Sequence, residues 1–105
     1  MRLDFYLKVT RLVPRRSGAG DLCRDGMVEV NGRPGKAGRQ VRPGDRIKVR
    51  FLSRVLAVEV LGLPSKKSVS KVEAREFYNL LEEKRFDLWG REVTPKPPDG
   101  GERGQ

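Results

Sequence analysis

The chain has 105 residues, with 23 Lys and Arg against 14 Asp and Glu, so its formal net charge is +9. It contains no His and one Cys, Cys23, which excludes an internal disulfide, His-based acid–base catalysis and Cys/His zinc sites. A chain of this length buries only a modest core and leaves little room for a deep catalytic pocket. We therefore expect a binding protein that is not an enzyme and that needs no cofactor or metal.

The positive charge is concentrated in the first part of the chain. Residues 1–61 carry 14 basic and 6 acidic side chains, whereas residues 62–105 carry 9 basic and 8 acidic ones. A surface that only kept the protein soluble would spread its charge evenly, while clustered positive charge attracts polyanions. Residues 1–61 are therefore predicted to face the phosphates of a nucleic acid.

The sequence shows neither a signal peptide nor a segment that would bind or span a membrane. The N-terminus, MRLDFYLKV, lacks the apolar stretch and the small-residue cleavage site of a signal peptide. No long apolar run or strongly amphipathic basic helix occurs elsewhere. We expect the protein to stay in the cytoplasm.

The first predicted element is a helix that Asp4 caps and that Pro14 either ends or kinks. Four apolar residues fall on one stripe at helical spacing: Phe5, Val9, Leu12 and Val13. Lys8 and Arg11 lie beside this stripe, and Arg15 and Arg16 lie at the bend that follows it. Because the guanidinium group can bind a phosphate through two parallel hydrogen bonds, two arginines at a helix junction suit a phosphate backbone.

A second, short helix is predicted from Ser17, as its N-cap, to Gly26, as its C-terminal stop. Cys23 shares its apolar face with Ala19 and Leu22 and is predicted to be a core residue. Gly18 and Gly20 weaken a helix interior by about 1 kcal/mol each, so this helix must depend on tertiary packing.

Strands and tight turns follow. Met27–Val30 is predicted to be a strand that ends in an Asn31–Gly32 turn, and Pro43–Asp45 is predicted to be the turn before a strand over Arg46–Phe51. In that last strand the apolar and basic residues alternate, so its cations form either a solvated, edge-protecting face or an RNA-facing one. A further strand is predicted over Val55–Leu61.

The rest of the chain is predicted to hold one more helix. After a linker over residues 62–67, Ser70 and Glu73 form a capping-box pattern. An apolar stripe then follows at helical spacing: Ala74, Phe77, Tyr78 and Leu81. We expect this helix to cover the sheet, with docking of a partner as the alternative, and Trp89 either to pack beside it or to lie exposed. The predicted organisation is a domain over residues 1–61, this linker and helix over residues 62–92, and a disordered tail over residues 93–105.

Residues 1 to about 60 resemble the S-four RNA-binding domain, also called the alpha-L motif. The matching residues are Arg2–Asp4, Leu7, Leu12, Arg16, Ala19, Leu22, Gly26, Val28–Gly32 and Val41–Val49. The resemblance implies an α+β fold with two N-terminal helices packed on a small, mainly antiparallel sheet. It also implies recognition of structured RNA by shape and backbone, which agrees with the way proteins bind A-form RNA.

The resemblance further implies RNA contacts from Arg2, Lys8, Arg11, Arg15, Arg16 and Lys36. Asp4 is expected to cap the first helix and orient a neighbouring arginine, while Asn31 and Gly32 are expected to serve the turn. The chain departs from the family pattern at Phe5, where a basic residue is common, and at Gly20, where a longer polar or basic residue is common. Contacts from these two positions are therefore not expected.

Within this family the chain resembles small bacterial factors of ribosome-associated quality control. The resemblance implies binding to ribosomal RNA and to peptidyl-tRNA on the free large subunit, in support of an RqcH-type partner that adds alanine tails to stalled chains. The alternatives are a related heat-shock protein that rescues stalled large subunits, and a more general structured-RNA-binding protein. We expect the free protein to be a monomer. An RNA-modifying enzyme is not expected, because residues 62–105 cannot supply a catalytic domain.

Overall fold

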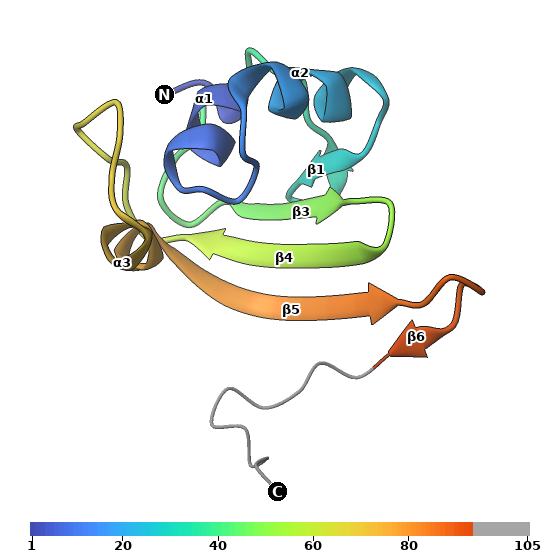
Figure 1. Ribbon diagram of the computed structural model, residues 1–105. Coiled ribbons are helices and arrows are strands. Elements are labelled where there is room, and N and C mark those ends of the chain that lie inside the picture. The colour runs from blue at the N-terminus through green and yellow to red at the C-terminus, as the bar shows by residue number, and fades with distance from the viewer. Residues whose placement is uncertain (94–105) are drawn as a thin grey trace, which may run out of the picture.

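Two helices pack on one face of a six-stranded antiparallel sheet in this computed structural model, which describes residues 1–93 (Figure 1). The helices are α1 (Leu3–Val9) and α2 (Arg16–Arg24), and a short α3 (Lys71–Ala74) continues into a 3-10 turn, η1 (Arg75–Phe77). The strands are β1 (Val28–Val30), β2 (Arg33–Pro34), β3 (Arg46–Arg50), β4 (Arg54–Val60), β5 (Tyr78–Phe86) and β6 (Glu92–Val93). Their order in the sheet is β2-β1-β3-β4-β5-β6. This arrangement confirms the α+β class that the sequence predicts.

The N-terminus of α1 is capped by backbone groups from a distant loop. The amide N–H groups of Leu3 and Asp4 donate to the carbonyl oxygens of Arg39 and Ala37, at 2.8 and 3.2 Å. Arg2, the N-cap residue, forms a β-bridge with Gln40 and makes no capping bond with its side chain. The prediction that Asp4 caps the helix is therefore wrong, because the loop carbonyls already satisfy these donors and Asp4 lies inside the first turn.

The helix is also shorter than predicted. It ends at Val9, and the hydroxyl group of Thr10 donates to the carbonyl oxygen of Tyr6 at 2.7 Å. Arg11 then adopts a φ of 61°, the left-handed conformation that stops a helix. Pro14 therefore follows the end of the helix instead of causing it.

The buried face of α1 consists of Leu3, Tyr6 and Leu7, each fully buried in the main core. The predicted stripe divides between two clusters. Phe5 and Val9 pack in a second, smaller cluster with residues around α3, whereas Leu12 and Val13 lie beyond the end of the helix and join the main core. A seven-residue helix that touches the sheet on one side and α3 on another has two buried faces, and a single apolar stripe cannot describe both. Burial of the Tyr6 hydroxyl raises its pKa well above the usual range.

Local signals in the next segments are confirmed, with one exception. Asn31 and Gly32 have φ values of 54° and 82°, as the predicted tight turn requires, and Gly26 ends α2 with a φ of 75°. Cys23 is buried in the core. The exception is Ser17, because Arg15 occupies the N-cap position and makes no side-chain capping bond.

The alternating pattern of the central strands is confirmed. Ile47 and Val49 of β3 are buried, as are Leu56, Val58 and Val60 of β4. On the outer face, the guanidinium group of Arg50 forms an ion pair with Glu29 at 2.8 Å. This pair supports a structural role for that basic residue, because its charge is used within the sheet.

The predicted third helix is largely a strand. The capping box is confirmed, since the Ser70 hydroxyl and the Glu73 carboxylate each accept the other residue's backbone N–H at 3.1 Å, which lowers the pKa of Glu73. However, α3 ends at Ala74, and Tyr78–Phe86 pairs with β4 around a β-bulge at Ala57 and Val58. The unpaired edge of β4 offers backbone hydrogen bonds that outweigh the helical spacing of the apolar residues.

The end of the described chain differs from the prediction as well. Val93 belongs to β6 and not to a tail, whereas the rest of the predicted tail, residues 94–105, lies outside the described residues. Trp89 is exposed, which decides between the two alternatives for this residue. No helix within residues 1–93 is both long and apolar enough to span a membrane.

We expect Gly35→Ala to lower the free energy of unfolding by about 1–3 kcal/mol. A Cβ at residue 35 would lie 2.8 Å from Leu3 Cδ2 and 2.9 Å from Val30 Cγ2, so the core would have to move. Gly20→Ala is the matched control, because a Cβ there meets nothing within 4 Å, and we expect it to stabilise α2 by about 0.5–1 kcal/mol. Chemical denaturation measures both, and equal effects would contradict the close approach at Gly35.

Candidate nucleic-acid interface

Asp4 lies at the point where α1, α2 and the loop over residues 35–40 meet. Its carboxylate oxygens accept hydrogen bonds from Arg2 Nε at 3.3 Å and from Arg16 Nε at 3.4 Å. The side chain of Asp4 is only 9% exposed, while those of Arg2 and Arg16 are each 50% exposed. A buried carboxylate needs such partners, because removing an unpaired charge from water is costly. Asp4 therefore orients both arginines, as predicted for one of them.

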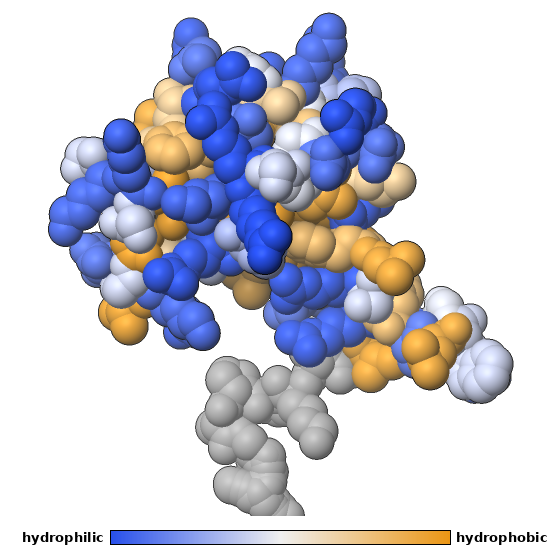
Figure 2. All heavy atoms as spheres, turned by 45° about the horizontal axis from the view of Figure 1, so that its top comes forward, coloured by the Kyte–Doolittle hydropathy of each residue, from blue (hydrophilic) through white to orange (hydrophobic). Residues whose placement is uncertain are grey.

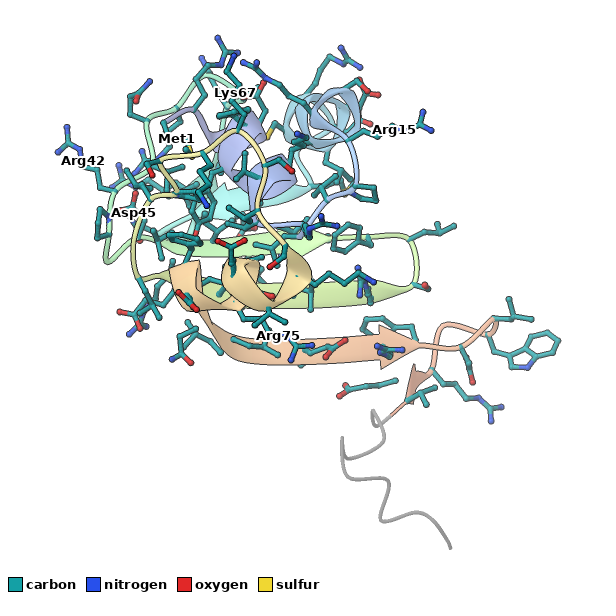
Figure 3. All side chains as sticks on the ribbon, turned by 60° about the vertical axis from the view of Figure 1, so that its left-hand side comes forward. Met1, Arg15, Arg42, Asp45, Lys67 and Arg75 are labelled. Carbon is teal, nitrogen blue, oxygen red and sulfur yellow. The ribbon has the colours of Figure 1, made fainter. Side chains whose placement is uncertain are left out.

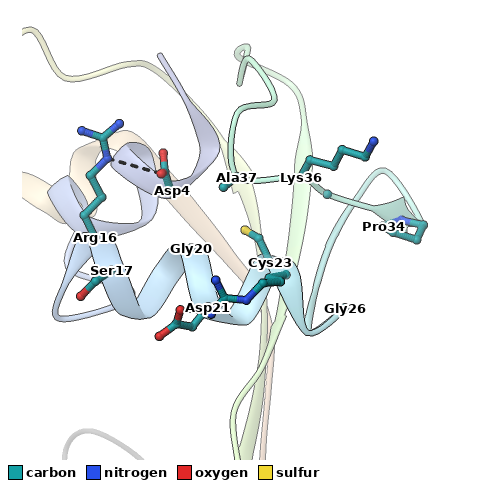
Figure 4. Close-up of a pocket in the computed structure, with 12 residues that line it drawn as sticks. Asp4, Arg16, Ser17, Gly20, Asp21, Cys23, Gly26, Pro34, Lys36 and Ala37 are labelled. Carbon is teal, nitrogen blue, oxygen red and sulfur yellow. Dashed lines mark hydrogen bonds and ion pairs between the residues drawn. The ribbon is translucent and has the colours of Figure 1, made fainter.

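Arg16 is held from two sides. Besides its bond to Asp4, its guanidinium carbon lies 5.3 Å from the centroid of the Phe5 ring, within the range of a cation–π contact. Within residues 1–93 no protein group pairs with its two terminal nitrogens, which point away from Asp4 (Figure 4). Phe5, which departs from the family pattern, thus supports an arginine that can still bind a phosphate.

A cleft of about 910 Å³ opens beside Arg16, between α2 and the loop over residues 34–37 (Figure 4). The charged residues that line it are Asp4, Arg16, Asp21, Arg24 and Lys36. Asp4 is already paired with two arginines, and Asp21 forms an ion pair with Arg24. Viewed with the helices turned toward the reader, hydrophilic side chains cover much of this part of the surface (Figure 2). The cleft can therefore receive an anionic ligand.

Cys23 lines the same cleft without offering reactive chemistry. Burial raises the pKa of its thiol, and the negative charge of Asp4 raises it further. Because the thiolate is the reactive form, the thiol stays protonated and inert. Residues 1–93 also contain no group of three or more His, Cys, Asp or Glu side chains that could hold a metal ion.

The structure brings only part of the predicted RNA-binding set together. Arg16 and Lys36 line the cleft, and Arg2 lies beside it, with its guanidinium group about 3.8 Å from the position that a Cβ of Gly38 would take. Arg15 is exposed at the start of α2 and points into solvent (Figure 3). These four side chains remain predicted RNA contacts.

Lys8 and Arg11 have contacts of another kind. Lys8 Nζ donates to the carbonyl oxygen of Lys67 at 3.3 Å, and Arg11 Nε donates to that of Val69 at 2.8 Å. Both side chains thus attach the loop before α3 to the end of α1. Their predicted RNA contact would have to compete with these bonds.

Asn31 serves its turn, with its side chain bonded to Asp45 at 3.1 Å and to the backbone N–H of Arg46 at 2.9 Å.

Sequence reasoning missed Arg24, which lines the cleft with Arg16. The signal was present, because Arg16, Gly20 and Arg24 are spaced four residues apart and therefore share a face of α2. Gly20, between the two arginines, leaves open space for a ligand to approach the helix.

The comparisons with known proteins show the family and the fold to which the chain is similar. Residues 1–47 match the S4 domain family model. The chain is 41% identical over 83 residues to the "RQC P-site tRNA stabilizing factor" of Halalkalibacterium halodurans, a match that covers 79% of this chain and 92% of that protein. It is 40% identical over 86 residues to the protein of the same description in Bacillus subtilis, covering 82% and 98%. The fold resembles that of Heat Shock Protein 15 of Vibrio cholerae, with a TM-score of 0.70, 24% identity and coverage of 77% of this chain and 81% of that one.

We expect Asp4→Asn to weaken binding to structured RNA, although it makes the net charge more positive by one. The substitution removes the carboxylate that orients Arg2 and Arg16, and it should also cost about 1 kcal/mol of stability, a modest value because both arginines are half exposed. Glu76→Gln changes the net charge equally at an exposed residue of η1 that does not line the cleft, and it is the control. Filter binding measures both, and tighter binding by Asp4→Asn would show that net charge outweighs orientation.

Proposed function

The chain belongs to the S4-domain family of RQC P-site tRNA stabilizing factors, the RqcP proteins, and we propose that it is a non-catalytic RNA-binding factor of bacterial ribosome-associated quality control. In this proposal it binds ribosomal RNA and stalled peptidyl-tRNA on the free large subunit in the cytoplasm. It supports an RqcH-type partner that adds alanine to the nascent chain.

The observation that carries the proposal is the pair of arginines held by Asp4 beside the basic cleft. Arg2 and Arg16 belong to different elements, yet one buried carboxylate fixes the direction of both guanidinium groups. Since the arginines are oriented before RNA arrives, less side-chain entropy is lost on binding. A-form RNA presents its phosphates and 2′-hydroxyl groups more readily than its bases, and guanidinium groups suit those phosphates.

Such a factor needs no chemistry of its own. A protein that binds one tRNA position more tightly than the alternatives shifts the population toward that position. The shift is limited by the difference between the two binding free energies, so each contact that exists only in the favoured state contributes. Holding peptidyl-tRNA in the P site in this way would keep it ready for the next alanyl-tRNA.

The related heat-shock protein is the alternative. The chain shares its fold with Heat Shock Protein 15, but only 24% of its sequence, against 40% or 41% with the two tRNA stabilizing factors. The higher identity favours the tRNA stabilizing role.

We expect the tagged protein purified from cells to carry large subunits, peptidyl-tRNA and an alanine-tailing partner. Arg2→Ala and Arg16→Ala should each lose most of these companions while keeping the fold, because both arginines are half exposed. Arg75→Ala, an exposed residue of η1 on another part of the surface (Figure 3), removes the same charge and should retain them. Recovery of intact ribosomes or unrelated RNAs would contradict the quality-control role, and unchanged recovery by both variants would remove these arginines from the site.

Binding to isolated large-subunit RNA should weaken steeply with salt, because each phosphate contact releases counterions. With about 3 to 6 phosphates contacted, a plot of log affinity against log salt concentration should have a slope of about that magnitude. Anisotropy of labelled RNA at several salt concentrations measures it. A flat dependence would indicate that a protein surface is the main target.

A further inference from the structure

The turn between β5 and β6 presents large apolar side chains to solvent. Leu88 is 98% exposed and Trp89 is 81% exposed at its tip. β6 lies at the opposite edge of the sheet from β2, and the turn projects beyond the body of the protein (Figures 1 and 3). A space-filling view shows apolar side chains at this projecting end (Figure 2). Exposed tryptophan at a protruding position is a feature of binding surfaces.

The turn is held in one shape by its own hydrogen bonds. The carboxylate of Asp87 accepts the backbone N–H groups of Trp89 and Arg91 at 2.9 and 2.8 Å. The backbone N–H of Gly90 donates to the carbonyl oxygen of Asp87 at 3.0 Å, and Gly90 takes a φ of 80°. The side chain of Asp87 is therefore used inside the turn, while the indole of Trp89 is exposed to solvent.

Arginines gather next to this turn. Arg54 and Arg85 lie directly opposite each other in the pairing of β4 with β5, where two like charges destabilise a sheet. Glu83 compensates Arg85 in part, at 3.1 Å, and the Arg54 guanidinium carbon lies 4.6 Å from the centroid of the Phe51 ring. An anion bound between the two arginines would relieve the remaining repulsion.

The two turns at this end of the sheet lie side by side. The backbone N–H of Phe86 donates to the carbonyl oxygen of Ser53 at 2.8 Å, which joins the β3–β4 turn to the end of β5. Leu52 of one turn and Trp89 of the other are both exposed, and the paired residues Arg54 and Arg85 lie in the strands that these turns follow or precede. An aromatic ring beside guanidinium groups is the combination with which proteins bind single-stranded nucleic acid, because bases stack on the ring while the phosphates meet the cations.

We propose that Arg54, Arg85, Trp89 and Arg91 form a second RNA contact, called the hairpin platform, on which an unpaired nucleobase stacks against Trp89 while its phosphates meet the arginines. The inference rests on the proposed function in taking RNA as the ligand. Stacking uses the π-face that every base offers, so the platform selects unpaired nucleotides and not a base sequence. Two contacts on separate elements also restrict the orientation of the RNA, and the second forms at a high effective concentration once the first is made.

Intrinsic fluorescence tests the platform, because Trp89 is the only tryptophan of the chain. Full-length protein is titrated with a duplex RNA that carries a short single-stranded extension and with the same duplex without the extension, while anisotropy of the labelled RNA reports binding. We expect the extended RNA to quench Trp89 strongly and the blunt duplex to leave it nearly unchanged. Unaltered fluorescence at saturating extended RNA would overturn the proposal.

Substitutions at the exposed tip separate stacking from other effects. Trp89→Ala should weaken binding of the extended RNA by about 5- to 100-fold without changing the salt dependence, and Trp89→Phe should restore part of it. Leu88→Ala is the control, since this neighbour is equally exposed and has no ring to stack. Arg85→Ala should reduce the magnitude of the salt slope by about one. If Trp89→Ala and the native chain bind RNA equally well, the platform is overturned. The same result is expected if the tip of the turn binds a protein instead of RNA.

The same titration distinguishes this inference from the proposed function. In the Arg16→Ala variant, in which Asp4 keeps Arg2 as its partner, RNA should bind more weakly yet still quench Trp89 once the RNA is saturating. Strong RNA binding by the native chain without quenching of Trp89 would leave the Asp4-centred site and remove the platform. Quenching with an affinity that Arg16→Ala does not change would keep the platform and remove the Asp4-centred site. Absence of RNA binding by the native chain would overturn both.

Discussion

The carboxylate of Asp4 is a buried negative charge at the junction of three segments, and much of the molecule is arranged around its compensation. The backbone N–H of Asp4 donates to the carbonyl oxygen of Ala37, which ties the first turn of α1 to the loop over residues 35–40. Burial without partners would cost several kcal/mol, and the two guanidinium groups beside it remove most of that cost. Arg16, at the start of α2, and Arg2, before α1, must therefore lie within reach of the Asp4 carboxylate. The need to pair this buried charge thus also places two guanidinium groups side by side on the surface, where they suit phosphates.

The loop over residues 35–40 connects this arrangement to the core. Gly35 lets the chain pass close to Leu3 and Val30, and the following carbonyl groups then reach the first turn of α1. Lys36, on the same loop, is placed on the opposite wall of the cleft from Arg16. The core therefore positions the predicted RNA-binding residues directly, and a substitution that disturbs the packing of this loop should also move the side chains that line the cleft.

The C-terminal segment extends the sheet beyond the part that carries the two helices. β5 completes the exposed edge of β4 and then continues to a turn that projects from the sheet. Contacts that lie far apart on one protein increase its affinity for a ligand that spans them and restrict the orientation of that ligand. The basic cleft near one edge of the sheet and the projecting hairpin at the other suit an RNA ligand with more than one element.

The sequence by itself determined the features that depend on a few neighbouring residues. The Asn31–Gly32 turn, the end of α2 at Gly26, the Ser70–Glu73 capping box and the alternation of β3 follow from local backbone preferences and side-chain periodicity. The family resemblance placed Arg2, Arg16 and Lys36 in one candidate site. Arg24 was within reach of the same reasoning, because helical spacing puts it on the face of Arg16.

Only the tertiary structure decided the features that depend on distant partners. Asp4 orients arginines without capping α1, because carbonyl groups more than thirty residues away satisfy the helix donors first. Lys8 and Arg11 bind the loop before α3, a contact that no local pattern encodes. Tyr78–Phe86 is a strand because the edge of β4 lies beside it, although its apolar spacing fits a helix. Backbone donors and buried charges take whichever partners the fold brings near, and sequence proximity does not specify those partners.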